Sequence, residues 1–91
     1  MEKADDIHGM QYKDFMDRIV VNPNVMVGKP VIKGTRVAVS EIVNRVAQGQ
    51  TFQDIAEDLE ISEDDIRAAL MYAGKLVEGE DIFPAIIGSK T

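Results

Sequence analysis

Hydrophobic and polar residues follow two different periods along this chain, and the period changes near residue 39. Before that point, the stretch IVVNPNVMVGKPVIKGTRVAV contains short runs rich in β-branched residues, separated by Asn-Pro-Asn, Gly-Lys-Pro and a further glycine. Such runs, broken by turn-forming residues, are typical of short strands. The sequence therefore predicts a β-hairpin or small ribbon over this stretch.

From Val39 onward the apolar residues recur at helical spacing, which predicts a first helix that stops at Gly49 and a short second one that begins at Thr51. Thr51 is an N-cap candidate, and Asp54 stands at the position that completes a capping box. The two apolar stripes are Val39, Ile42, Val43, Val46 and Ala47, and then Phe52, Ile55, Ala56 and Leu59.

A third helix is predicted to begin after Ser62, an N-cap with Asp65 at the third helical position. Its inward residues are predicted to be Ile66, Ala69, Leu70, Ala73 and Leu76 or Val77. Only Glu60-Ile61-Ser62 joins helices two and three, so the pair resembles the bihelical unit of helix-turn-helix proteins. Many such units have a glycine where this chain has Glu60.

The predicted fold is mainly α: a three-helix, helix-turn-helix-like (homeodomain-like) bundle preceded by an N-terminal β-hairpin or ribbon. Residues 18–77 are expected to form this single domain. Residues 1–17 precede it as a segment that is partly helical or mobile, and residues 78–91 follow it as a C-terminal tail for partner or dimer contact.

The composition excludes many classes of protein. With no cysteine and a single histidine, His8, the chain cannot build a thiolate metal site or a histidine-based catalytic site by itself. The acidic pairs lie at termini or helix starts, where acids are ordinary. We therefore expect no enzyme, no catalytic or metal-binding residue and no cofactor. Without a membrane-spanning run or a signal peptide, we expect a cytoplasmic protein with no membrane contact.

The net charge of −6 is unevenly distributed. Residues 1–17 hold two basic and five acidic residues, residues 18–45 hold five basic and one acidic, and residues 46–91 hold three basic and ten acidic. The central cations would form a patch suited to phosphates or to an acidic protein, or simply a solvated hairpin. The candidate nucleic-acid-binding residues are Arg18, Lys29, Lys33, Arg36, Arg45 and Arg67.

The start of the third helix argues against base reading, because Glu63, Asp64 and Asp65 would repel the DNA backbone. Tyr72 lies off the main apolar stripe and belongs either to the edge of the core or to a dimer face. The tail is too apolar for us to expect all of its side chains to be exposed to water, so we expect them to pack against another surface. The candidate partner-binding residues are Tyr72, Glu80, Asp81, Ile82, Phe83, Ile86 and Ile87.

The string RIVVNPNVMVGKPVIKGTRVAVSEIV, followed by AQGQTFQDIAEDLEISEDDIRAALMYA, resembles the family catalogued as domain of unknown function 433, over roughly residues 18–73. Members are small prokaryotic proteins with a helix-turn-helix-like core, widely regarded as VapB-type antitoxins paired with PIN-like ribonuclease toxins. The resemblance implies an antitoxin role here, and no catalytic role for its matching positions. Those positions are Gly28, Lys29, Pro30, Gly34, Thr35, Arg36 and Tyr72.

We therefore expect an antitoxin-like binding protein, a homodimer, whose tail binds a PIN-like ribonuclease toxin and whose basic ribbon supports binding to operator DNA. Two alternatives stay open. One is a freestanding helix-turn-helix transcription regulator that reads DNA through the third helix. The other is a structural homodimer in which the tail serves only as a subunit clasp.

Overall fold

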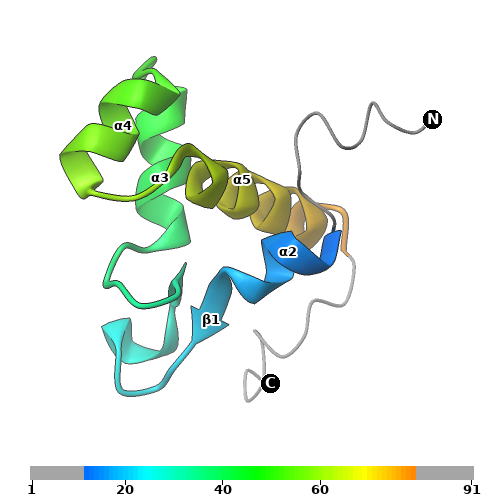
Figure 1. The fold of residues 1–91 in the computed structure, drawn as a ribbon. Helices are drawn as coiled ribbons and strands as arrows, with labels where there is room; N and C mark the ends of the chain where they lie inside the picture. Colours follow the sequence, from blue (N-terminus) through cyan, green and yellow to red (C-terminus); the bar gives the residue numbers. More distant parts are fainter. Residues whose placement is uncertain (1–11, 80–91) are drawn as a thin grey trace.

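The structure, a computed structural model, describes residues 12–79 (Figure 1). Within this range the chain is mostly helical and carries one two-stranded antiparallel hairpin, as the sequence predicts. The elements in chain order are α2 (Tyr12–Asp17), β1 (Ile19–Val21), the 3-10 helix η1 (Met26–Gly28), β2 (Pro30–Ile32), α3 (Val39–Ala47), α4 (Phe52–Leu59) and α5 (Glu63–Val77).

The hairpin pairs β1 with β2, and Ile19 lies opposite Ile32. Between the strands the chain makes a left-handed turn that the sequence did not indicate: Met26, Val27 and Gly28 have φ of 53°, 56° and 80°. A β-branched residue with positive φ is strained, because its Cβ crowds the backbone. Val27 is also 91% exposed, so no packing of its side chain offsets that strain.

The ends of α3 and α4 follow from local chemistry. α3 stops before Gly49, which has a φ of 91° and so fulfils the predicted glycine stop. The Thr51 hydroxyl accepts a hydrogen bond from the Asp54 N–H (3.0 Å) and caps α4. At the other end of α4, Glu60 takes the left-handed conformation (φ 59°), where many helix-turn-helix units have glycine.

The start of α5 is held by a complete capping box. The Ser62 hydroxyl accepts from the Asp65 N–H, and the Asp65 carboxylate accepts from the Ser62 N–H, each at 3.0 Å. This confirms the predicted N-cap. Since the two bonds satisfy backbone donors that a helix start otherwise leaves unpaired, they fix the residue at which α5 begins.

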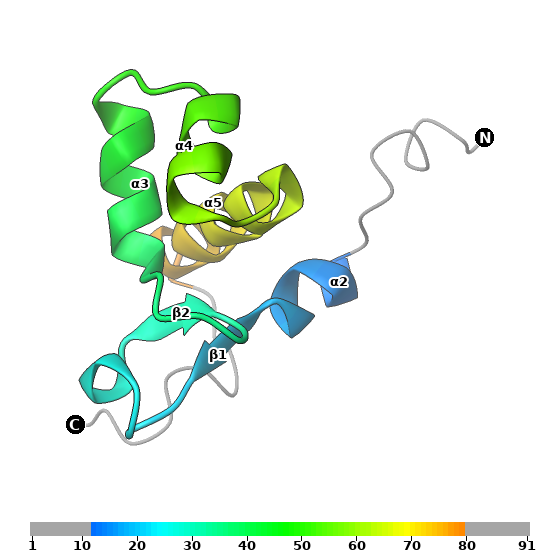
Figure 2. The ribbon, with the colours of Figure 1, turned by 60° about the vertical axis from the view of Figure 1, so that its left-hand side comes forward.

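The core lies where α3, α4 and α5 meet the inner face of the hairpin, which extends below the helices in Figure 2. Tyr72 is fully buried there, whereas Leu76 is 40% and Val77 86% exposed. The prediction that Leu76 or Val77 turns inward is therefore wrong: neither belongs to the core cluster, whereas Tyr72, one turn before Leu76, does. The largest fully buried side chains are Tyr72, Ile42, Ile55, Ile66 and Val31.

The longest helix between residues 12 and 79 is α5, with 15 residues. In this range, no helix combines the length and the apolar character needed to cross a bilayer.

Candidate partner-binding groove

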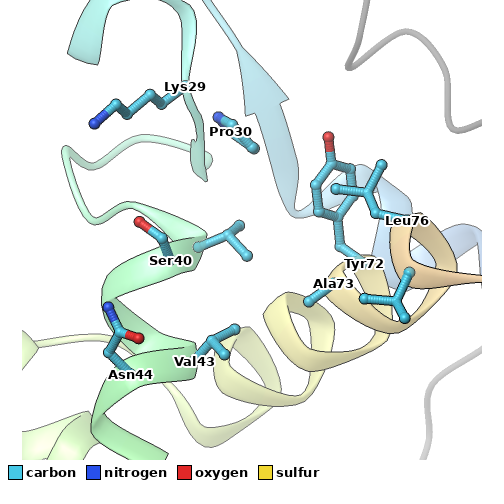
Figure 3. Close-up of a pocket in the computed structure, with 10 residues that line it drawn as sticks. Lys29, Pro30, Ser40, Val43, Asn44, Tyr72, Ala73 and Leu76 are labelled. Atoms are coloured by element: carbon cyan, nitrogen blue, oxygen red, sulfur yellow. The ribbon is translucent and has the colours of Figure 1, made fainter.

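An apolar groove of about 510 Å³ opens between α3 and α5, beside the start of β2 (Figure 3). Val43 extends from α3 toward Ala73 on α5, while Pro30 lies on the hairpin side of the opening. Lys29 is the single charged residue among those that line the groove. The lining residues are Lys29, Pro30, Val39, Ser40, Val43, Asn44, Tyr72, Ala73, Leu76 and Val77.

The groove follows from the spacing of residues on its two helices. Side chains four residues apart lie one above the other on a helix, so Val39 and Val43 form one apolar wall. Tyr72 and Leu76 form the facing wall by the same rule. Exposed apolar residues at a groove often mark an interaction surface, and Val77, at the end of the α5 wall, is largely exposed to solvent.

Tyr72 carries a polar group in this apolar setting. Its hydroxyl is buried and has no hydrogen-bond partner within the part of the chain that the structure describes. Burial raises the pKa of the Tyr72 phenol above its ordinary value of 10.0, because the charged form would lose its hydration. Of its two predicted roles, the structure therefore places Tyr72 in the core, with one side bordering the groove.

Three of the six candidate nucleic-acid-binding residues are engaged by carboxylates of the same chain. Arg18 donates to Asp65 (2.8 Å), which joins the start of β1 to the start of α5. The sequence could not indicate this pair, since 47 residues separate its members. The guanidinium of Arg18 is consequently committed to a contact within the fold.

Arg45 is held by two carboxylates, one from each of two helices. Its Nη1 donates to Asp58 on α4 (2.6 Å), and its Nη2 donates to Glu41 one turn earlier on α3 (3.0 Å). These bonds, above all the one donated to Asp58, raise the pKa of the Arg45 guanidinium above its ordinary value. The Glu41–Arg45 pair has the i, i+4 spacing that a sequence reader can recognise.

Arg67 is the second cation near the acidic start of α5, after Arg18. It donates to Asp64 (3.2 Å), lies 3.9 Å from Glu63, and stacks over the Phe52 ring of α4 at 5.4 Å. Each contact is partly exposed and therefore modest. Together they turn the guanidinium toward its own helix pair, and the carboxylates around it keep the local charge negative.

Lys29, Lys33 and Arg36 remain, and all three are exposed. None of them forms an ion pair with another residue between 12 and 79. The loop that presents Lys33 and Arg36 is fixed by Thr35, whose hydroxyl donates to the Ile32 carbonyl (2.8 Å) and accepts from the Val37 N–H (2.9 Å). Within the predicted set, these three are the cations that no carboxylate between residues 12 and 79 engages.

The six predicted tail residues Glu80, Asp81, Ile82, Phe83, Ile86 and Ile87 lie outside the described residues. In the described range, no three His, Cys, Asp or Glu side chains gather so that they could hold a metal ion. Sequence reasoning missed the groove. Its signal was the pair Leu76–Val77, two apolar residues next to each other at the end of a helix that needs only one of its faces for the core.

The fold defines a class, a small mainly helical domain that carries a two-stranded antiparallel hairpin. More particularly, the chain belongs to the family described as "Protein of unknown function (DUF433)", whose sequence profile matches residues 19–73. The family resemblance noted from the motifs is thus confirmed, while the antitoxin role stays a prediction.

Two relatives give further comparisons. A protein of Archaeoglobus fulgidus, described as uncharacterized, is 71% identical over 24 residues, which are 26% of this chain and 67% of that protein. The crystal structure of Rv2018 from Mycobacterium tuberculosis is similar with a TM-score of 0.57 and 35% identity, over 66% of this chain. The matched part is 27% of that longer chain.

Proposed function

We propose that this protein is a non-enzymatic, antitoxin-like binding protein of the cytoplasm that neutralises a PIN-like ribonuclease toxin. The observation that carries the proposal is the apolar surface at the end of α5, where Leu76 and Val77 are exposed beside an apolar groove. That surface leads directly into the acidic and apolar residues of the tail. A surface of this kind suits a protein partner better than a nucleic acid.

In this mechanism the tail orders against the toxin. Apolar side chains such as Ile82 and Phe83 enter a groove of the toxin, as in other peptide–groove complexes. The carboxylates of Glu80 and Asp81 then lie on the basic path along which a ribonuclease binds RNA. The tail would thus both anchor the complex and block the path along which the toxin binds RNA. Because the tail would lose conformational entropy when it orders, the affinity gained per unit of buried area would be lower.

The acidic start of α5 supports this function over base reading. We propose that α3, α4 and α5 form a homeodomain-like helix-turn-helix bundle, in which α5 would be the reading helix. Its first turn carries Glu63, Asp64 and Asp65, and the nearby cations Arg67 and Arg18 are already engaged by these carboxylates. A helix with this charge would be repelled from the phosphates that flank a major groove.

The test uses a PIN-like protein encoded beside this chain, with the full chain compared with one that ends at Gly79. We expect the full chain to bind the toxin and to suppress its ribonuclease activity, and the shortened chain to do neither. The matched control, Glu57→Gln in the full chain, changes one exposed carboxylate of α4 and should leave both unchanged. Equal binding by the full and shortened chains would reject the tail mechanism.

A second function, binding of operator DNA, is favoured by one observation: Lys29, Lys33 and Arg36 are exposed and have no ion pair with the other described residues. Such cations can contact phosphates without first breaking a bond inside the fold. In this proposal the hairpin and the loop after it supply the contacts, and α5 does not.

A further inference from the structure

We propose that the groove between α3 and α5 is the docking site for the chain's own C-terminal segment, residues 82–87, in the protein without a partner. The proposal goes beyond toxin binding, because it concerns the free molecule and assigns an occupant to a surface within it.

Continuity of the chain is the first argument. Leu76 and Val77, which line the groove, are the last apolar residues of α5, and the chain continues from Gly79 directly into the tail. Gly79 has a φ of 82°, and its N–H donates to the Leu76 carbonyl (3.0 Å). A left-handed residue just after a helix ends the helix there, so the tail begins in the chain next to the groove-lining residues Leu76 and Val77.

Reach is the second argument. From Gly79 to Ile86 there are seven residues, which span about 23 Å when extended. A helix with its side chains is about 10–12 Å wide, so this length is enough to cross from α5 to α3. Pro84 favours such an extended path, because it fixes φ near −65° and restricts the preceding residue to extended backbone.

Chemical character is the third argument. The segment Ile82-Phe83-Pro84-Ala85-Ile86-Ile87 contains no charge, and it matches a groove lined by Val39, Val43, Ala73 and Leu76. Lys29, the single charged lining residue, is a cation, and the tail begins with the two anions Glu80 and Asp81. Removing several apolar side chains from water and covering exposed Leu76 and Val77 both favour docking.

Docking of this kind would regulate the proposed function. The same apolar residues that bind the toxin would be held in the groove of the free protein, so the toxin would have to displace them. The groove is then an intramolecular competitor whose effective concentration is set by a link of a few residues, which is in the millimolar range for short flexible links.

The absence of native cysteine allows a direct test by disulfide trapping in the full chain. The test pair is Asn44→Cys, at the exposed rim of the groove, with Ile86→Cys. The matched control pair is Gln53→Cys, an exposed polar position on α4 that does not line the groove, with the same Ile86→Cys. At micromolar protein we expect the test pair to form an intramolecular disulfide at least about tenfold faster than the control pair.

Each outcome decides the proposal. Equal rates for the two pairs would overturn it, and covalent dimers that increase with protein concentration would overturn it in favour of the tail of a second copy. Circular dichroism of the reduced variants checks that both pairs leave the fold intact, which is expected because Asn44 and Gln53 are exposed.

A second measurement avoids any change inside the described domain. Amide NMR signals of Val43, Ala73 and Leu76 should differ between the full chain and the chain that ends at Gly79, and Phe83→Ser in the full chain should move them toward the shortened chain. The signal of Ile55, which lies in the core and does not line the groove, is the internal reference. Identical groove signals in all three proteins would contradict docking. Both tests use the protein alone, so their failure leaves toxin binding standing, and failure of toxin binding leaves docking standing.

Discussion

At the scale of single residues, Tyr72 shows a conflict between packing and hydrogen bonding. Its ring fills the core, while its buried hydroxyl has no partner within residues 12–79. An unpaired buried hydroxyl costs about 1–3 kcal/mol of desolvation. Tyr72→Phe keeps the ring and removes the hydroxyl, so it should raise the free energy of unfolding by about 1 kcal/mol in urea denaturation. A loss of stability would show that the hydroxyl is hydrogen-bonded in solution.

Tyr72 also makes the free energy of unfolding depend on pH in the alkaline range. Burial raises the pKa of Tyr72 in the folded chain above 10.0, its value when unfolded. Below pH 10 the phenol is neutral in both states; above it, the unfolded chain releases the proton more readily, so the folded state loses stability as pH rises. The stability advantage of Tyr72→Phe should therefore grow above pH 10. A constant difference between pH 7 and 11 would contradict the raised pKa.

Glu60 is the second residue for which the structure predicts whether a replacement raises or lowers the stability of the fold. It holds a left-handed conformation (φ 59°, ψ 45°), which costs a residue with a side chain about 1–2 kcal/mol. Glycine removes that cost but adds freedom to the unfolded chain, so Glu60→Gly should stabilise by up to about 1 kcal/mol. The control Glu57→Gly, at an exposed position inside α4, should destabilise by about 1 kcal/mol. The same sign for both changes would rule out the backbone explanation.

At the scale of elements, the capping box at the start of α5 gives a test of helix initiation. Ser62→Ala removes the acceptor for the Asp65 N–H and should lower the free energy of unfolding by about 1 kcal/mol in urea denaturation. Ser62→Thr keeps a hydroxyl at the same position and should retain most of the stability. If the two variants lose equal stability, the capping bond is not what stabilises this end of α5.

The elements also show how far the sequence alone could lead. The end of α3 and the starts of α4 and α5 were predictable, because glycine stops and hydroxyl caps act within one helical turn. The inner position of Tyr72 was not, since the side of α5 that faces the core is set by α3 and the hairpin. The left-handed turn at Val27 was hidden as well, because no residue there other than Gly28 favours positive φ.

The candidate site was predictable in the same uneven way. The i, i+4 spacing could indicate the Glu41–Arg45 ion pair. It could not indicate the ion pair between Arg18 and Asp65, which are far apart in the sequence. The groove itself depends on how α3 crosses α5 and on where β2 starts, which are properties of the packed chain. The sequence pattern therefore identified the candidate cations as a group. Only the fold shows which of them form ion pairs with carboxylates between residues 12 and 79 and which do not.

At the scale of the whole molecule, the charge distribution predicts how operator DNA would be bound. The chain has a net charge of −6, and the predicted phosphate-binding cations that have no ion pair with a residue between 12 and 79 are Lys29, Lys33 and Arg36. A homodimer would offer six such cations, which gives a slope of about −5 for log affinity against log salt. Lys33→Glu with Arg36→Glu should abolish this binding, because it reverses four of the six charges.

Arg67→Ala is the matched control and should change neither affinity nor slope, since its guanidinium is held by Asp64 and Phe52. If Arg67→Ala instead relaxes the sequence preference by about 1–3 kcal/mol per base pair, α5 reads bases and the hairpin does not.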